Sequence, residues 1–201
     1  MSAVDRNPRR RRNPAQTRQA IIDALLEQLK AGVAAPTTKA IAAGARTSER
    51  SIFVHFPERD EMLAAATDQQ SAHVETLITS VDPQQPLSER IDAMVTQSAA
   101  IFDVQRFPRP LGLVESRNIP AIDERMRLTD RRMRDSIGHA FAPELARAAD
   151  PDALLDLLDA TLAWPVRHHL VERAGLTRSA ASSRVGRMLR ALITAETSTD
   201  D

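Results

Sequence analysis

Residues 41–63 read IAAGARTSERSIFVHFPERDEML and contain two short helical patterns joined by a tight turn. The first pattern places apolar residues at helical spacing, at Ile41, Ala42 and Ala45. Thr47 and Ser48 are competing N-caps for the second pattern, which ends before Pro57 because a proline disfavours helix at the preceding residue. The stretch therefore predicts two short helices within one compact unit.

A longer helix is expected on the N-terminal side of this pair. Asn13 followed by Pro14 supplies an N-cap and a first-turn proline, and one apolar face then continues as far as Gly32. The apolar residues of that face are Ile21, Ile22, Leu25, Leu26 and Leu29. A further helix is expected after the pair, from near Glu58 to the Asp82-Pro83 step.

The rest of the chain also predicts helices. Apolar residues recur every three or four positions over 87–107, 111–115, 120–141, 151–175 and 177–196, with Pro165 as a kink in the segment 151–175. No segment shows the alternation typical of a strand. The sequence therefore predicts an all-α fold of about nine helices, in which an N-terminal three-helix domain precedes a larger helical domain.

These patterns predict four parts of the chain. Residues 1–13 form a flexible basic arm, residues 14–62 the three-helix domain, residues 63–196 the larger helical domain, and residues 197–201 a disordered tail.

Composition excludes several classes of protein. The 201 residues are 42% hydrophobic, which suits a packed core. The absence of cysteine removes disulfides, thiolate metal sites and cysteine nucleophiles. No signal peptide is apparent, and no segment reaches the roughly 18–20 apolar residues that span a bilayer. We therefore expect a soluble cytoplasmic protein without a membrane partner or a cofactor.

Charge is distributed unevenly although the net charge is zero. Residues 1–60 contain 11 Arg or Lys and 6 Asp or Glu, whereas the remaining residues contain 16 and 21. A basic first part joined to an acidic remainder indicates that the first part alone meets a polyanion.

Residues 41–63 resemble the helix-turn-helix of the TetR (tetracycline-repressor) family of transcriptional regulators. The residues that carry the resemblance are Ile41-Ala42, Ala45, Ser48, Ile52-Phe53, Phe56, Arg59 and Met62-Leu63, with Thr17-Arg18, Ile21, Ala24 and Gly32 upstream. The resemblance implies a homodimer that binds double-stranded DNA at a palindromic operator. A short helix presented by a tight turn can enter the major groove, which is roughly 12 Å wide.

The resemblance also implies which residues contact DNA. These are Thr37, Thr38, Arg46, Ser48, Glu49, Arg50, Ser51, Phe53, Val54, His55 and Arg59, together with Arg9, Arg10, Arg11 and Arg12 of the arm. Arg50 is the leading candidate for reading a guanine, and its alternatives are a phosphate contact or a solvated side chain. Glu49 either accepts from a cytosine or complements the helix dipole, and His55 either donates to a phosphate or is structural.

Three positions depart from the family pattern. Arg46 stands where the family has a turn glycine, Phe53 replaces a tyrosine, and Arg59 replaces a lysine. If the backbone at Arg46 is left-handed, a non-glycine residue costs on the order of 1 kcal/mol there. The arm arginines either insert into the minor groove or bind phosphates non-specifically.

In the resembled family, a small molecule bound by the second domain weakens the affinity for DNA. The residues expected to bind such an effector are Met94, Ser98, Phe102, Phe107, Met126, Thr129, Met133 and Trp164. The residues expected at the dimer interface are Leu158, Leu162, Val166, His169, Val185, Gly186, Leu189 and Leu192. Core packing within one chain is the alternative for both sets.

Two other functions, an enzyme and an architectural DNA-binding protein, are supported by fewer features of the sequence. An enzyme needs a catalytic group of residues, and the nearest candidate for one or for a metal site is His168 with Glu172 on one helix face. A lone pair at this spacing is more often an interface or surface ion pair, so we expect no catalytic residue and no metal site. A non-specific or architectural DNA-binding dimer without an effector is the second alternative, because Arg46 and Phe53 depart from the family pattern.

Overall fold

The computed structural model describes residues 13–197, and all the regular secondary structure of this part of the chain is helical, without a strand. The all-α prediction is therefore confirmed. The α-helices are α1 (Pro14–Lys30), α2 (Thr38–Ala45), α3 (Glu49–His55), α4 (Arg59–Leu77), α5 (Leu87–Gln105), α6 (Pro108–Glu115), α7 (Pro120–Ala140), α8 (Ala142–Leu145), α9 (Pro151–Leu162), α10 (Trp164–His168) and α11 (Arg178–Thr197). A π-helical turn, His169–Arg173, follows α10. The chain divides into two compact units, Met1–Ala66 and Thr67–Asp201.

Side-chain caps fix where the helices of the first unit begin. Asn13 accepts from the Ala15 amide at 3.1 Å and forms a capping box with Gln16 at the start of α1. Thr37 Oγ1 accepts from the Ala40 amide at 3.2 Å, and Ser48 Oγ accepts from the Ser51 amide at 3.1 Å. Of the two competing caps of α3, the structure therefore uses Ser48.

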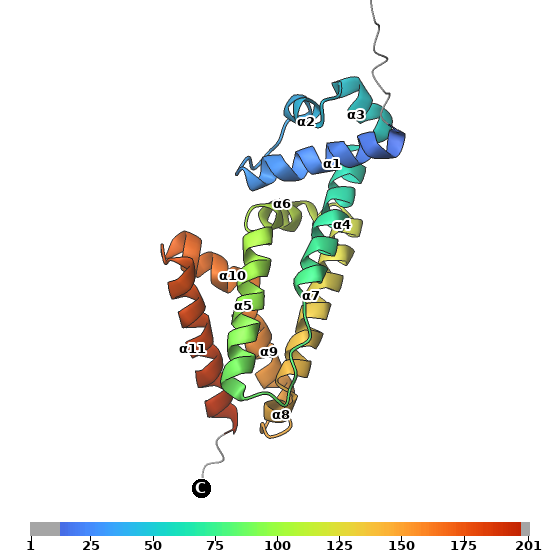
Figure 1. The fold of residues 1–201 in the computed structure, drawn as a ribbon. Helices are drawn as coiled ribbons and strands as arrows, with labels where there is room; N and C mark the ends of the chain where they lie inside the picture. The colour runs from blue at the N-terminus through green and yellow to red at the C-terminus, as the bar shows by residue number, and fades with distance from the viewer. Residues whose placement is uncertain (1–12, 198–201) are drawn as a thin grey trace, which may run out of the picture. The chain divides into compact units, whose positions relative to one another are not determined.

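The three N-terminal helices pack against one another (Figure 1). They enclose a small apolar core. Its most buried side chains are Ile21, Leu25, Ile41, Ile52 and Phe56. The guanidinium of Arg18 lies 4.3 Å from the centre of the Phe56 ring, so an exposed cation covers one face of this core. This packing holds α3 on two supporting helices.

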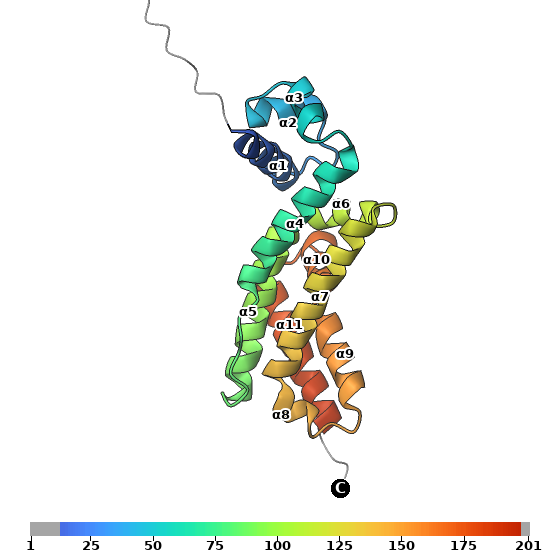
Figure 2. The same cartoon turned by 90° about the vertical axis from the view of Figure 1, so that its right-hand side faces the viewer.

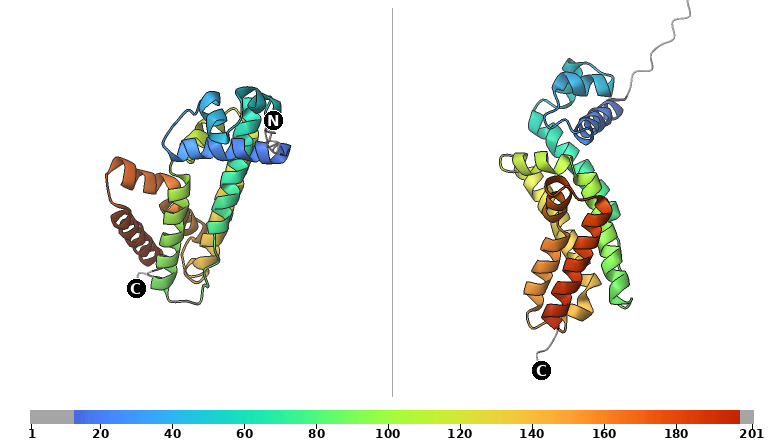
Figure 3. Two further views of the ribbon diagram at one scale, coloured as in Figure 1. Left: turned by 45° about the horizontal axis from the view of Figure 1, so that its top comes forward. Right: turned by 90° about the vertical axis from the view of Figure 1, so that its left-hand side faces the viewer.

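In the second unit, α11 packs against α5 and α9, and α7 packs against α9 (Figures 2 and 3). The side chains that these helices bury form one apolar cluster. It includes Ile91, Met94, Ile137, Phe141, Leu154, Leu158, Val185 and Leu189. Among the described residues, no helix combines the length and the apolar character that crossing a membrane requires.

Two helix boundaries differ from the expected ones. Instead of a kink at Pro165, the chain leaves the helical conformation at Ala163, whose ψ is 154°, so that α9 and α10 are separate helices. Helix α4 ends at Leu77 rather than near Asp82. The amide and hydroxyl of Thr79 both donate to Gln97 Oε1, at 2.8 and 2.9 Å, so α5 holds this segment outside the helix.

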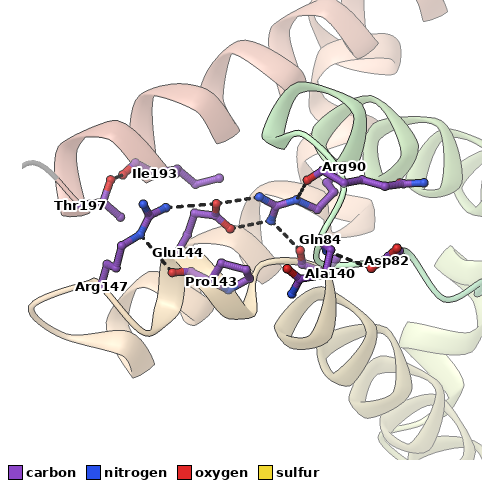
Figure 4. Close-up of polar contacts among 10 residues, drawn as sticks. Asp82, Gln84, Arg90, Ala140, Pro143, Glu144, Arg147, Ile193 and Thr197 are labelled. Atoms are coloured by element: carbon purple, nitrogen blue, oxygen red, sulfur yellow. Dashed lines mark hydrogen bonds and ion pairs between the residues drawn. The ribbon is translucent and has the colours of Figure 1, made fainter.

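A buried ion pair joins α5 to α8 (Figure 4). The guanidinium of Arg90 is bidentate to the Glu144 carboxylate at 2.6 and 2.7 Å, and it also donates to the Ala140 carbonyl at 2.8 Å. Burial alone raises the pKa of Glu144, but the hydrogen bonds and charge of Arg90 outweigh it and hold the pKa below its ordinary value. Arg90 is thus a buried cation whose charge is compensated.

Candidate nucleic-acid interface and cavities

Helix α3 has one buried face and one exposed face. Ile52 points into the core, whereas the side chains of Phe53 and Val54 are 58% and 69% exposed. Glu49 and Arg50 in the first turn are exposed as well, and Ser51 and His55 are half-buried at the edge of this face. Two large apolar side chains in water are unusual for such a short helix, which points to a surface that meets a partner.

Arg50 is the cation in the first turn of this face. It forms no ion pair with the described residues and is exposed, so its guanidinium is free to approach a partner. Such a side chain can contact either a base edge or a phosphate group.

The turn between α2 and α3 has the left-handed conformation that the family's glycine would favour. Arg46 has φ 53° and ψ 47° and is the only non-glycine residue with a positive φ among the described residues. The Thr47 amide donates to the Ala42 carbonyl at 3.0 Å, which closes the end of α2 as a Schellman turn does. Arg46 adopts this backbone and exposes its side chain.

The remaining candidates for DNA contact lie at helix starts. Thr37 is exposed, its oxygen caps α2, and Thr38 beside it is half-buried. Ser48 is exposed and caps α3, while Arg59 is exposed at the start of α4. Amides at helix starts favour anions such as phosphates. The arm residues Arg9, Arg10, Arg11 and Arg12 lie outside the described residues.

A cavity of about 240 Å³ lies in the second unit, among α4, α5, α7, α9 and α10. Five of the eight residues expected to bind an effector line it: Ser98, Phe102, Thr129, Met133 and Trp164. The other three do not: Met94 is buried in the apolar core, Phe107 lies under the Arg106 guanidinium, and Met126 lies against Gly112.

Sequence reasoning missed most of the polar wall of this cavity. Arg109 donates to both oxygens of Asp130, at 3.0 and 2.9 Å, and to Gln105 at 3.4 Å. Gln105 and Arg109 follow Phe102 at helical spacing, but Arg109 lies between the helices expected over 87–107 and 111–115, so the spacing did not predict that it shares a wall with Phe102. Asp159 lies on another wall, and burial raises its pKa despite the nearby Arg134.

Trp164 adds an aromatic wall with a hydrogen-bond donor. Its ring stacks on His168 at 4.3 Å and lies 6.3 Å from the Phe102 ring. Its Nε1 is buried and has no acceptor within the described part of the chain. The cavity thus combines aromatic surface with several polar groups, as small-molecule sites do.

His168 and Glu172 each contact another side chain. His168 stacks on Trp164, and Glu172 pairs with Arg106. Among residues 13–197, no three His, Asp or Glu side chains are close enough together to hold a metal ion.

Most residues expected at a dimer interface lie in the core of the single chain. Leu158, Leu162, Val185 and Leu189 are fully buried, and a Cβ on Gly186 would meet Val95 and Ile91 of α5. For these five positions the alternative, an intramolecular core, describes the structure. Val166 and Leu192 are half-buried and His169 is exposed.

The outward surfaces of α9 and α11 carry other apolar residues. Leu157 and Met188 are 41% and 40% exposed. Each directly precedes a buried leucine, Leu158 and Leu189, so a sequence pattern cannot tell which of two neighbouring leucine or methionine residues faces the core.

Residues 21–66 match the family model described as bacterial regulatory proteins, tetR family. A transcriptional regulator from Rhodococcus sp. Rha1 has a similar structure, with 16% identity, a TM-score of 0.69, and coverage of 94% of this chain and 100% of that one. A putative TetR-family transcriptional regulator from Mesorhizobium loti has 14% identity, a TM-score of 0.64, and coverage of 92% and 98%. RolR in complex with resorcinol has 16% identity, a TM-score of 0.54, and coverage of 92% and 97%. No curated protein matches this chain in sequence.

Proposed function

This chain belongs to the TetR family of bacterial regulatory proteins, and we propose that it is a cytoplasmic repressor that a small molecule releases from a palindromic operator. The observation that carries the proposal is the exposed face of α3, which presents Arg50, Phe53 and Val54 from a helix held by a left-handed turn. In this proposal residues 14–62 are the DNA-binding domain and no part of the chain is catalytic.

Arg50 reads a base in this proposal, because it is exposed, unpaired and in the first turn of the helix that enters the groove. Thr37, Arg46 and Arg59 contact phosphates from the starts of helices and from the turn, and so fix the register of α3 on the DNA. Phe53 lies where the family has a tyrosine and contributes apolar contact to a thymine methyl group or a sugar.

The cavity of the second unit binds the effector in this proposal. Its aromatic wall at Phe102 and Trp164 and its polar groups at Arg109 and Thr129 suit a small molecule with a ring and a hydrogen-bonding substituent. The complex of RolR with resorcinol supports the same ligand class, although that ligand belongs to RolR. Binding lowers DNA affinity only if the effector prefers the dimer shape that does not fit the operator.

Selection of genomic fragments by the purified full-length protein tests the proposal. The expected result is enrichment of an inverted repeat whose half-sites lie about 34–36 Å apart, with a preference over random DNA of at least about a thousandfold. Equal affinity for random DNA would instead support the architectural alternative. Release from the selected site by a molecule that also protects Trp164 fluorescence from quenching would support the effector role.

A further inference from the structure

A second buried arginine of the helical unit has no carboxylate partner. Arg167 of α10 is 2% exposed, and its Nε and Nη2 donate to Ser98 Oγ at 2.9 and 2.7 Å. Nη2 also donates to the Val95 carbonyl at 2.6 Å, and Nη1 donates to Ser182 Oγ at 3.2 Å. All of these acceptors are neutral, and within residues 13–197 Arg167 forms no ion pair.

Arg90, in the same unit, is a buried arginine whose charge is compensated by a carboxylate. Arg90 is buried to a similar degree and is bidentate to Glu144, whereas Arg167 has only two hydroxyls and a carbonyl. An uncompensated charge in a protein interior is strongly unfavourable. Burial lowers the pKa of Arg167 to about 10, partly offset by Asp103, so the side chain remains charged at neutral pH.

A pocket of about 170 Å³ lies against Arg167, between α5, α10 and α11. This volume far exceeds the roughly 10–15 Å³ that a single water needs. Its lining includes hydrogen-bond donors, from Arg167, Arg178, Ser179 and Ser182, and apolar surface, from Phe102 and Val171. The pocket therefore combines cationic and hydroxyl groups with apolar surface.

Two further features favour an anion in this pocket. The start of α11 lies at its rim, where Thr177 Oγ1 accepts from the Ala180 amide, and the amides of the first turn of a helix favour negative charge. Asp103 also lines the pocket, but it pairs with Arg178 at 2.8 Å and leaves Arg167 without a carboxylate. The four hydrogen bonds of Arg167 leave one of its five N–H donors for a ligand.

We propose that this pocket binds a small organic acid, whose carboxylate pairs with Arg167 and whose apolar body lies against Phe102 and Val171. The pocket shares Phe102 with the larger cavity, but Arg167, Arg178 and Ser182 line this pocket and not the larger one. The proposal does not depend on DNA binding. A carboxylate supplies the charge that Glu144 supplies to Arg90. A neutral molecule of the same shape cannot do so.

Calorimetric titration of the full-length protein with hexanoate and benzoate, each beside its primary amide, tests the site. We expect at least one acid to bind at least about tenfold more tightly than its amide, because a hydrogen bond to a charged group is stronger than one to a neutral group. If neither acid binds, or if acid and amide bind equally, the proposal is overturned.

Variants locate the binding. Arg167→Met, which keeps the apolar stem and removes the charge, should weaken binding of the acid by at least about tenfold. The control is Arg109→Met in the larger cavity, which should leave that affinity unchanged. Loss in Arg109→Met but not in Arg167→Met would place the acid in the larger cavity and refute the proposal.

The exposed Arg178→Gln variant keeps the test decisive if circular dichroism shows that Arg167→Met does not fold. Arg178 lies at the rim, so its replacement should lower the affinity for the acid and leave that for the amide unchanged. An unchanged affinity for the acid in this variant would then count against the site.

Discussion

The roles of three arginines in this protein depend on whether a carboxylate compensates the charge of each side chain. Arg50 is exposed and unpaired on α3, Arg90 is buried with a carboxylate, and Arg167 is buried without one. The residue type is the same in all three cases, and sequence reasoning singled out only Arg50. The other two could not be found from sequence, because their partners lie about 50 to 70 residues away along the chain.

Arg50→Ala tests whether Arg50 contacts a base. If Arg50 pairs with a guanine, the variant should lose about 1–3 kcal/mol of operator affinity and discriminate less at one base position. Affinities for the selected operator and its single-base variants, measured by fluorescence anisotropy at fixed salt, check this. The control Lys30→Ala, which removes an exposed cation of α1 rather than α3, should keep both the affinity and the base preference. An equal loss on all DNA sequences in Arg50→Ala would make Arg50 a phosphate contact.

Glu144→Gln tests the buried ion pair. Removing the carboxylate leaves Arg90 charged and uncompensated, so we expect the free energy of unfolding at pH 7 to fall by about 3–5 kcal/mol. Urea denaturation measures this. The double variant Arg90→Met with Glu144→Leu should recover much of the loss, because it removes both charges; no recovery would show that the packing of these residues, rather than the charge, is decisive.

The same pair predicts how stability depends on pH. The pKa of Glu144 is lowered in the folded protein, so its contribution is present above the ordinary value of 4.5 and is lost as the pH falls through the lower folded value. In urea titrations between pH 7 and pH 3, the stability gap between wild type and Glu144→Gln should therefore narrow below pH 4.5. A gap that stays constant to pH 3 would contradict the lowered pKa.

At the level of helices, starts were more predictable than ends. Asn13 is a cap that the sequence identifies, and Ser48 is one of the two caps it offers for α3, because a short polar side chain before an apolar pattern can accept a helix amide. The end of α4 and the break at Ala163 depend instead on Gln97 of another helix and on the packing of α9 and α10. Such long-range contacts leave no periodic signal.

Ser48→Ala tests the N-cap of α3. Because Ser48 Oγ accepts from the Ser51 amide, we expect the variant to lose about 1 kcal/mol of stability in the first unit and to bind the operator more weakly. The matched variant Thr47→Ala should change neither, since Thr47 does not cap α3. Urea denaturation and operator binding of both variants decide between the two residues, and an equal loss in both would reject this assignment.

For the whole molecule, the two-part sequence pattern predicted the fold class and the two short helices joined by a turn, but not the outward surface of the helical unit. Helices α9 and α11 are apolar on more than one side, so periodicity alone could not separate Leu157 from Leu158 or Met188 from Leu189. The cavity was more accessible to sequence reasoning, because Ser98 and Phe102 share a helix face, as do Thr129 and Met133.

The exposed leucine and methionine predict where two copies of the chain meet. A palindromic operator requires a two-fold dimer, and the outward surfaces of α9 and α11 expose Leu157 and Met188 in the single chain. The double variant Leu157→Glu with Met188→Glu should be a folded monomer by sedimentation and should bind the operator at least about a hundredfold more weakly, because the second half-site is no longer bound intramolecularly. Val114→Glu, at an exposed apolar position of α6, is the control and should remain dimeric. A double variant that stays dimeric with full operator affinity would place the interface elsewhere. Leu158 and Leu189 could not form that other interface, because their side chains are already buried within the single chain.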